Sequence, residues 1–146
     1  MPPSQVTVLD LLEQHFDTER VDDFQCETCN VRGPCEKRKT VTRWPPVLLV
    51  HLKRFALDVT GRMKKLEESV FFDEVTVSER FGFTYSLSAV AVHKGRFGSG
   101  HYVTYVQDSD GKWVLIDDVQ LPVEVPFERV QRSQAYLLVF RLVAAP

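Results

Sequence analysis

Near the start of the chain, apolar residues recur at the spacing of one helix face. Thr7 precedes them with Asp10 three residues later, an arrangement typical of a capped helix start. The apolar side of this helix comprises Val8, Leu11, Leu12, His15 and Phe16. The pattern therefore predicts an amphipathic helix that ends near Asp17.

Further along, the pattern changes to short apolar runs typical of strands. Val47–Phe55 follows Pro45-Pro46 and is almost continuously apolar, which predicts a central strand covered on both faces with His51 in the core. Other strands are predicted at 85–92, 102–107, 112–116 and 135–143, and Pro126 opens a short helix before the last of them. The polar, charged stretch 56–69 predicts a long mobile connection.

A predicted hairpin carries the most informative residues. Its strands are joined near Asp108–Gly111, and its open ends bear His101 and the pair Asp117-Asp118. A loop of 108–111 would place His101 opposite Asp118, whereas absorbing Gly111 as a bulge would place it opposite Asp117. Either carboxylate would accept the ring N–H, fix the tautomer and stabilise the imidazolium, as in a nucleophilic protease. The alternative interpretation is non-catalytic: His101 is a histidine at the end of a strand, and Asp117-Asp118 is a solvent-exposed turn.

Composition narrows the classes of protein. A chain of 146 residues with 44% hydrophobic content is long enough to bury one core, so residues 1–146 are expected to form a single domain. A net charge of −2 argues against nucleic acid as a partner. There is no apolar run of roughly 20 residues that would cross a membrane, and Met1-Pro2-Pro3-Ser4 lacks the pattern of a signal peptide.

The cysteines suggest a metal site. Only three occur, Cys26, Cys29 and Cys35, too few and too close together for a disulfide framework. Cys26-Glu27-Thr28-Cys29 has the spacing of half a tetrahedral zinc site, with Cys35 as a candidate third ligand. A redox motif is the competing interpretation.

The segment before His101 is rich in glycine. Gly95, Gly98 and Gly100 predict a flexible loop that lets another backbone approach closely. Together with other blocks of the sequence, this segment resembles the ubiquitin-specific proteases, the papain-like deubiquitinating enzymes. The resemblance rests on five sequence blocks in the family's order, at 49–55, 85–90, 100–105, 113–118 and 135–138.

That resemblance implies a thumb, palm and fingers architecture. This chain would supply the palm and part of the fingers, an α+β and mainly antiparallel portion that lacks the helical thumb. By similarity His101 matches the general base, Asp117 the acid that orients it, and Asp118 an adjacent residue that assists in some members. The loops 56–69 and 94–100 match loops that border the channel for the ubiquitin tail. The resemblance thus points to His93, Gly98, Gly100 and Tyr102 as substrate-binding residues, since flexible glycines favour a Gly-Gly tail.

The departures from the family pattern matter equally. Its nucleophilic cysteine lies in a Gly-Asn-x-x-Cys block that is absent here, and the cysteines of this chain match a finger tip. The chain by itself is therefore expected to be inactive, with ubiquitin or a ubiquitin-like modifier and an N-terminal half of the domain as partners. The family's second zinc-binding pair lies upstream of the residues matched, so the zinc site would be incomplete here. The expected location is cytoplasmic or nuclear.

Two alternatives stay open. The chain could be a non-catalytic ubiquitin-binding or scaffold module without a thumb, or a zinc-ribbon interaction protein with no link to ubiquitin. A palm without its thumb would also expose apolar area, so self-association is expected.

Overall fold

The computed structural model describes residues 5–146; residues 1–4, where the sequence predicts no signal peptide, lie outside the described part. The elements follow the order α1 (Val8–His15), β1 (Glu19–Gln25), β2 (Arg32–Lys37), β3 (Val47–His51), β4 (Phe55–Leu57), β5 (Met63–Lys65), β6 (Val75–Ser78), β7 (Phe83–Arg96), β8 (Ser99–Gln107), β9 (Trp113–Ile116), β10 (Val123–Val125), α2 (Phe127–Gln131) and β11 (Ala135–Ala144). The predicted fold class, mostly antiparallel strands with few helices, is confirmed.

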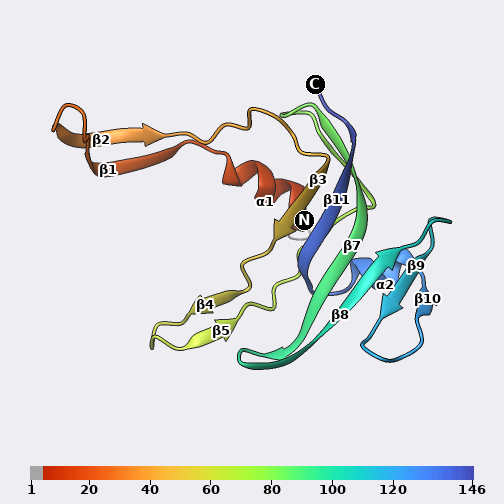
Figure 1. The fold of residues 1–146 in the computed structure, drawn as a ribbon. Coiled ribbons are helices and arrows are strands. Elements are labelled where there is room, and N and C mark those ends of the chain that lie inside the picture. Colours follow the sequence, from red (N-terminus) through yellow and green to blue (C-terminus); the bar gives the residue numbers. More distant parts are fainter. Residues whose placement is uncertain (1–4) are drawn as a thin grey trace.

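The main body is one antiparallel sheet in the order β10-β9-β8-β7-β11-β3, with β6 also paired to β7 (Figure 1). β7 is its longest strand and has a paired neighbour on each side at residues 84–86 and 89–92. β6 pairs with the first residues of β7 and β8 with its last residues, while β11 lies along its other edge. The long hairpin of β7 and β8 therefore extends from the most strongly supported part of the sheet.

A bulge in β7 decides which side chains face the core. Val139 pairs with Ala89 but Phe140 pairs with Leu87, so Ser88 is the extra residue. The buried positions accordingly change parity, from 83, 85 and 87 before the bulge to 90 and 92 after it. One face of the sheet thus stays turned toward the core along the whole strand.

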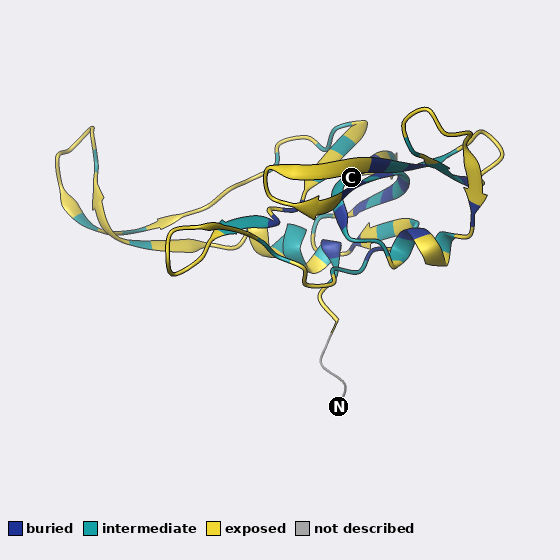
Figure 2. Cartoon of the chain, turned by 90° about the horizontal axis from the view of Figure 1, so that it is seen from below, coloured by how far each residue is buried: buried dark blue, intermediate teal, exposed yellow. Residues whose placement is uncertain are grey.

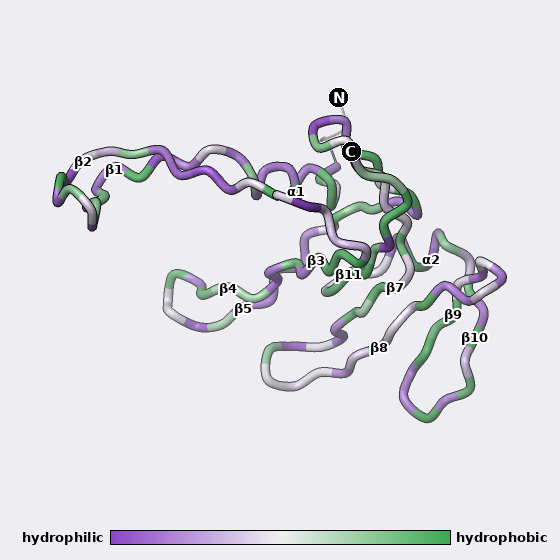
Figure 3. Tube along the Cα trace, turned by 45° about the horizontal axis from the view of Figure 1, so that its top comes forward, coloured by the Kyte–Doolittle hydropathy of each residue, from purple (hydrophilic) through white to green (hydrophobic). Residues whose placement is uncertain are grey.

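The core lies between that face and the two helices. α1 contributes Val8 and α2 contributes Val130, both fully buried against the sheet. Thr7 and Asp10 form the predicted capping box at the start of α1, and Phe16 ends the helix next to the predicted end at Asp17. The short helix predicted after Pro126 is likewise confirmed. Figure 3 shows hydrophobic residues gathered on β3, β11 and β9.

The predicted central strand Val47–Phe55 is wrong in its position. β3 ends at His51 and lies at the edge of the sheet, with β11 as its only partner among the described strands. Leu49 is 61% exposed and His51 is also exposed, not part of the core. An apolar run predicts a strand, but strand order depends on pairings distant in sequence.

Two predicted loops are structured hairpins. Within 56–69, β4 pairs with β5, and the Asp58 carboxylate accepts hydrogen bonds from the backbone N–H groups of Thr60 (2.8 Å) and Arg62 (3.0 Å) in the turn. Within 94–100, β7 and β8 stay paired up to Arg96 and Ser99, which leaves only Phe97 and Gly98 as the turn. Both segments are polar and short, so their pairing gives no apolar periodicity in the sequence.

The β1–β2 hairpin projects from the body as a separate arm (Figure 1). It is mostly exposed (Figure 2) and mostly hydrophilic (Figure 3). Both described helices are too short to reach across a bilayer.

Candidate active site

The hairpin of β8 and β9 carries His101 and Asp117 in a register that differs from both predictions. Gln107 pairs with Trp113 and Thr104 with Ile116, so the loop covers residues 108–112. The Asp108 carboxylate accepts hydrogen bonds from the N–H groups of Asp110 (2.9 Å) and Lys112 (2.8 Å) and so closes this longer turn. Neither acid therefore lies directly opposite His101.

His101 and Asp117 nevertheless meet, with 2.5 Å between Nε2 and Oδ1. Extending the register by one step from Thr104–Ile116 places Asp117 opposite Val103. His101 is two residues from Val103 and on the same face, so the two side chains are diagonal neighbours across the strand pair. The expectation that an acid lies at this histidine is confirmed, although the contact is diagonal rather than direct.

Asp118 approaches the other ring nitrogen. Its Oδ2 lies 3.6 Å from Nδ1 of His101, which is too long for a hydrogen bond. Asp118 has a left-handed φ of 48° and sits in a turn in which the Gln120 N–H donates to the Asp117 carbonyl (3.0 Å). The side chain of Asp117 is 20% exposed and that of Asp118 71%. Asp117 is therefore the shielded, hydrogen-bonded acid.

This geometry defines the chemistry available to the ring. A carboxylate on Nε2 holds the proton there and leaves the lone pair on Nδ1. Nδ1 is then the atom that can take a proton from a nucleophile, while Asp117 stabilises the imidazolium that results. The ring is 44% exposed, so another protein segment can approach it.

No thiol of the described chain is near this nitrogen. Cys26 and Cys29 lie at the end of the β1–β2 arm, and Cys35 lies on β2 opposite Val21. The arm extends away from the end of the sheet where β8 and β9 lie (Figure 1).

His93 and Tyr102 belong to an aromatic cluster beside the hairpin. They are directly opposed on β7 and β8, with ring centroids 4.8 Å apart. Phe55 lies 5.6 Å from His93 and Tyr136 lies 6.0 Å from Tyr102. His93 is 6% exposed, whereas Tyr102 is 53% exposed. Because Tyr102 follows His101 directly, the aromatic cluster (Phe55, His93, Tyr102 and Tyr136) lies on the opposite face of β8 from the His101 side chain.

Sequence reasoning missed Phe55 and Tyr136 as members of this cluster. Both stand in the blocks that carry the family resemblance, at 49–55 and 135–138, so a signal was present. They come together only in the folded chain, where Phe55 on β4 and Tyr136 on β11 both lie against His93 on β7.

Gly98 and Gly100, which the sequence predicts as substrate-binding residues, are each required by the structure, but for different reasons. A Cβ atom at Gly100 would lie 2.0 Å from Nε2 of His93, so a side chain there would displace the ring. Gly98 has a φ of 78° in the tight turn between β7 and β8, where other residues would be strained. The glycines thus build a compact hairpin rather than a flexible loop.

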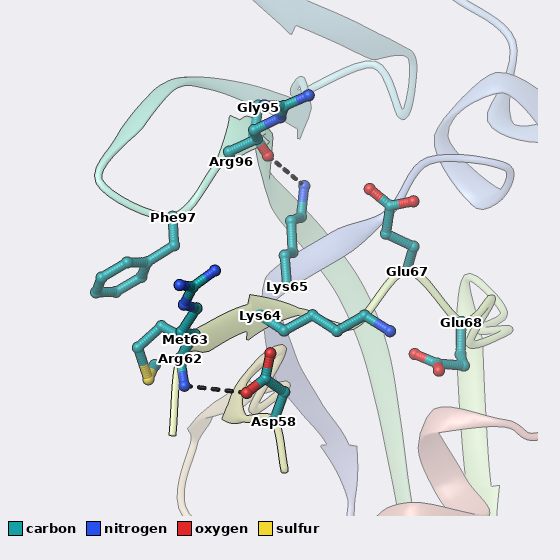
Figure 4. A pocket seen from close by; sticks show the side chains of 10 residues that line it. All are labelled: Asp58, Arg62, Met63, Lys64, Lys65, Glu67, Glu68, Gly95, Arg96 and Phe97. Carbon is teal, nitrogen blue, oxygen red and sulfur yellow. Dashed lines mark hydrogen bonds between the residues drawn. The ribbon is translucent and has the colours of Figure 1, made fainter. Parts of the chain in front are cut away.

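A groove of about 700 Å³ separates the tips of the β4–β5 and β7–β8 hairpins. Its lining includes Arg62 and Met63 from one hairpin and Arg96 and Phe97 from the other (Figure 4). The Lys65 ammonium donates to the carbonyls of His93 (2.6 Å) and Gly95 (3.4 Å), which ties β5 to β7. The two segments that the resemblance associates with a substrate channel therefore do face one another.

The Cys26–Cys29 turn fits part of a zinc site. The Asn30 N–H donates to the Cys26 carbonyl (2.8 Å), and hydrogen bonds to the sulfur from the backbone of Cys29 and Thr28 lower the pKa of the Cys26 thiol. Backbone donors that stabilise a thiolate also favour a metal ligand. Cys35 does not join this pair: in residues 5–146, no group of three potential ligands forms at the arm.

A family model for ubiquitin carboxyl-terminal hydrolase matches residues 4–140. The chain belongs to the ubiquitin carboxyl-terminal hydrolase family. Its predicted identity as the C-terminal part of a ubiquitin-specific protease catalytic domain is thereby confirmed.

Individual members support the assignment. Ubiquitin carboxyl-terminal hydrolase cyk-3 of Caenorhabditis elegans is 35% identical over 124 residues, which cover 80% of this chain and 10% of that protein. Ubiquitin carboxyl-terminal hydrolase 23 of Arabidopsis thaliana is 35% identical over 125 residues, 80% of this chain and 14% of the relative. The chain therefore spans only a small part of these hydrolases.

Solved hydrolase structures have the same fold. A yeast SAGA DUBm structure aligns with a TM-score of 0.83 at 26% identity, covering 99% of this chain and 34% of that one. A SAGA DUB module structure that contains Ubp8 aligns with a TM-score of 0.81 at 25% identity, covering 99% and 35%. The strand arrangement of this hydrolase segment thus recurs in experimentally determined structures.

Proposed function

We propose that this chain supplies the general base and its orienting acid for deubiquitination. The reaction is thiol-dependent hydrolysis of the isopeptide or peptide bond after the C-terminal glycine of ubiquitin or a ubiquitin-like modifier. The observation that carries the proposal is the 2.5 Å contact between His101 Nε2 and Asp117 Oδ1, in a chain of this hydrolase family. The nucleophilic cysteine is provided from outside residues 1–146, by an N-terminal half of the catalytic domain.

In the proposed mechanism, Nδ1 of His101 takes the proton of the incoming thiol. The thiolate attacks the glycine carbonyl, and the protonated ring then gives its proton to the leaving amine, which leaves an acyl-enzyme. His101 next takes a proton from the water that hydrolyses the thioester. Asp117 keeps the ring in place throughout, while Asp118, beside Nδ1, contributes negative charge without a hydrogen bond of its own.

The tail of the substrate is proposed to run through the groove between the hairpins and past Tyr102, and to cross the β7–β8 hairpin so that its last glycine reaches the face that carries the His101 side chain. The exposed Tyr102 would form one wall with the buried His93 ring supporting it from behind, and Gly98 and Gly100 would keep the hairpin thin enough for an extended Gly-Gly segment to pass. The groove lies between two hairpins joined by Lys65, so both of its walls are held in place before substrate binds.

Cys26 and Cys29 are proposed to bind Zn²⁺ as half of a structural site, completed by ligands from the same N-terminal half. Bound zinc would fix the end of the exposed arm, since exposed ion pairs such as Lys37–Glu19 (3.5 Å) stabilise a hairpin only weakly. We also propose that residues 1–146 act as one domain, in the cytoplasm or nucleus, where free thiols persist.

A test combines this chain with a separately expressed cysteine-bearing half and measures hydrolysis of ubiquitin that carries a C-terminal fluorogenic amide. The mixture should be active and each half alone inactive, and His101→Ala should remove the activity of the mixture. His15→Ala is the matched control, since His15 is an exposed histidine on α1 and touches no residue of the candidate site. Equal activity with and without His101 would refute the assigned base.

A second candidate is a non-catalytic ubiquitin-binding module. It is favoured by the absence of any cysteine near His101 in the described residues. Binding of ubiquitin by this chain, together with failure of every cysteine-bearing half to restore hydrolysis, would favour this candidate over the enzyme.

A further inference from the structure

Basic side chains gather around a second depression, which adjoins the groove between the hairpins and shares Lys65, Glu67, Gly95 and Arg96 with it. It has a volume of about 580 Å³ and lies between β5, the end of β7 and the residues around α2. Its charged lining consists of Lys65, Lys94, Arg96, Arg129, Arg132 and the single acid Glu67. Because the whole chain has a net charge of −2, this local positive excess does not follow from composition.

Most of these cations have no protein partner. Among residues 5–146, the side chains of Lys94, Arg96, Arg129 and Arg132 make no ion pair and no hydrogen bond, whereas the cations on the β1–β2 arm largely pair with carboxylates. Lys65 donates only to main-chain carbonyls and so keeps its net charge. Unneutralised cations around one concavity repel each other unless an anion binds there.

Unpartnered polar atoms accompany the cations. Ser133 lines the depression, and its Oγ is buried without a hydrogen-bond partner in the described chain. His93 also lines it, is 6% exposed, and has a buried Nδ1 with no partner. Buried polar atoms are nearly always paired, so a ligand that supplies partners would remove a cost.

We propose that this depression, the anion pocket, binds a small ligand that bears two or more phosphate groups. The guanidinium groups of Arg129 and Arg132 match phosphate oxygens in bidentate geometry, and residues three apart lie on one side of a helical turn. The volume is that of a small-molecule site. A single concave pocket, on a chain whose net charge is −2, does not provide the extended basic track that nucleic acid needs.

The position of the anion pocket also gives it a structural consequence. Lys94 lies directly opposite His101 in the β7–β8 ladder. A ligand held by Lys94 and Arg132 together would connect α2 to the hairpin that bears His101. This proposal concerns binding and does not depend on the proposed deubiquitination.

The test is a calorimetric titration of the full chain with sodium tripolyphosphate at low ionic strength. Saturable binding of one ligand per chain is expected. Arg129→Gln with Arg132→Gln should weaken it by about tenfold or more, because each charged hydrogen bond contributes roughly a decade of affinity. Arg20→Gln with Arg38→Gln removes the same charge from the arm and should leave the affinity within about twofold at matched ionic strength.

Thermal unfolding of each variant shows whether it folds. If the Arg129 and Arg132 variant does not, Lys94→Gln with Arg96→Gln, both exposed, replaces it with the same expectation. The proposal is overturned by non-saturable binding, or by equal weakening in the arm variant. It is also overturned if a poly-glutamate peptide binds while tripolyphosphate does not, which would indicate an acidic-peptide surface instead.

Discussion

The imidazole of His93 lies against the main chain of Gly100, so close that a Cβ atom there would be 2.0 Å from Nε2 and 2.6 Å from Cε1. This contact sets how the buried ring packs between Phe55 and Tyr102. It also sets the path of β8 one residue before His101. A residue with no catalytic atoms thus controls the position of the proposed base.

Gly100→Ala should therefore lower both stability and activity. Overpacking in a tight contact costs about 1–3 kcal/mol, and displacement of β8 would move His101 relative to Asp117. Chemical denaturation measures the free energy of unfolding. Gly33→Ala is the matched control, because nothing lies within 4 Å of its added Cβ, and should change stability by less than about 1 kcal/mol. Equal stability of the two variants would show that the His93 contact is not restrictive.

The two acids at His101 should differ sharply in importance. Asp117→Asn leaves the ring a neutral partner and permits the wrong tautomer, so kcat of the reconstituted enzyme should fall by about 10³- to 10⁴-fold. Asp118→Asn removes a carboxylate with no hydrogen bond to the ring and should lower kcat by about tenfold or less. Steady-state hydrolysis of a ubiquitin amide measures both. A larger loss of kcat for Asp118→Asn than for Asp117→Asn would show that Asp118, and not Asp117, orients the ring of His101.

The folding stability of α1 should depend on pH through Asp10. Hydrogen bonds from the Thr7 side chain and backbone (2.7 and 2.9 Å) lower the pKa of Asp10 from its ordinary 3.8. A carboxyl with a lowered folded pKa contributes stability that is present above the ordinary value and is lost as pH falls through the folded value. The stability difference between wild type and Asp10→Asn should therefore be constant above about pH 5 and vanish under strongly acidic conditions. Unfolding curves recorded across this pH range measure the stability difference. A difference that grows toward low pH would contradict a lowered pKa of Asp10 in the folded chain.

Zinc binding should depend on Cys26 and Cys29 but not on Cys35. Titration with Co²⁺ as a probe should give thiolate charge-transfer absorption that Cys29→Ser removes and Cys35→Ser retains. The affinity of this chain for Zn²⁺ or Co²⁺ should be weak, because the chain supplies only two thiolate ligands. Equal loss in the Cys35 variant would make Cys35 a ligand and would contradict the geometry of the arm.

The exposed edge of the sheet should drive self-association. Val47 and Leu49 on β3 are 53% and 61% exposed, and the outer edge of β3 has no strand partner in the described chain. Leu49→Lys should shift sedimentation toward monomer. Leu57→Lys, on the exposed β4–β5 hairpin at 67% exposure, should have little effect. A wild-type chain that sediments as a monomer at all concentrations would show that the edge is inert.

The sequence predicted the elements better than their arrangement. Val90 and Leu138 stand in apolar runs because burial selects them, so α1 and the strands β3, β7, β8, β9 and β11 could be located from the apolar pattern. The hairpins β1–β2 and β4–β5 and the short strands β6 and β10 could not, because few of their residues are buried. The edge position of β3 could not, since it depends on pairing with β11 far along the chain. The hairpin register failed because the Asp108 side chain lengthens the turn, which strand periodicity does not encode.

The candidate site, like the fold, could be predicted from the sequence only in part. His101 and its acids could be named from spacing and resemblance. Phe55 and Tyr136 could not be placed beside His93, because three separate strands bring them together.

In the proposed reaction, His101, held by Asp117, activates a thiol that comes from outside residues 1–146. The most direct measurement is covalent labelling by ubiquitin with a C-terminal electrophile, followed by mass spectrometry of each chain. Labelling of the cysteine-bearing half is expected only in the mixture, and it should be lost when the mixture contains His101→Ala. Labelling of Cys26, Cys29 or Cys35 in this chain alone would contradict it.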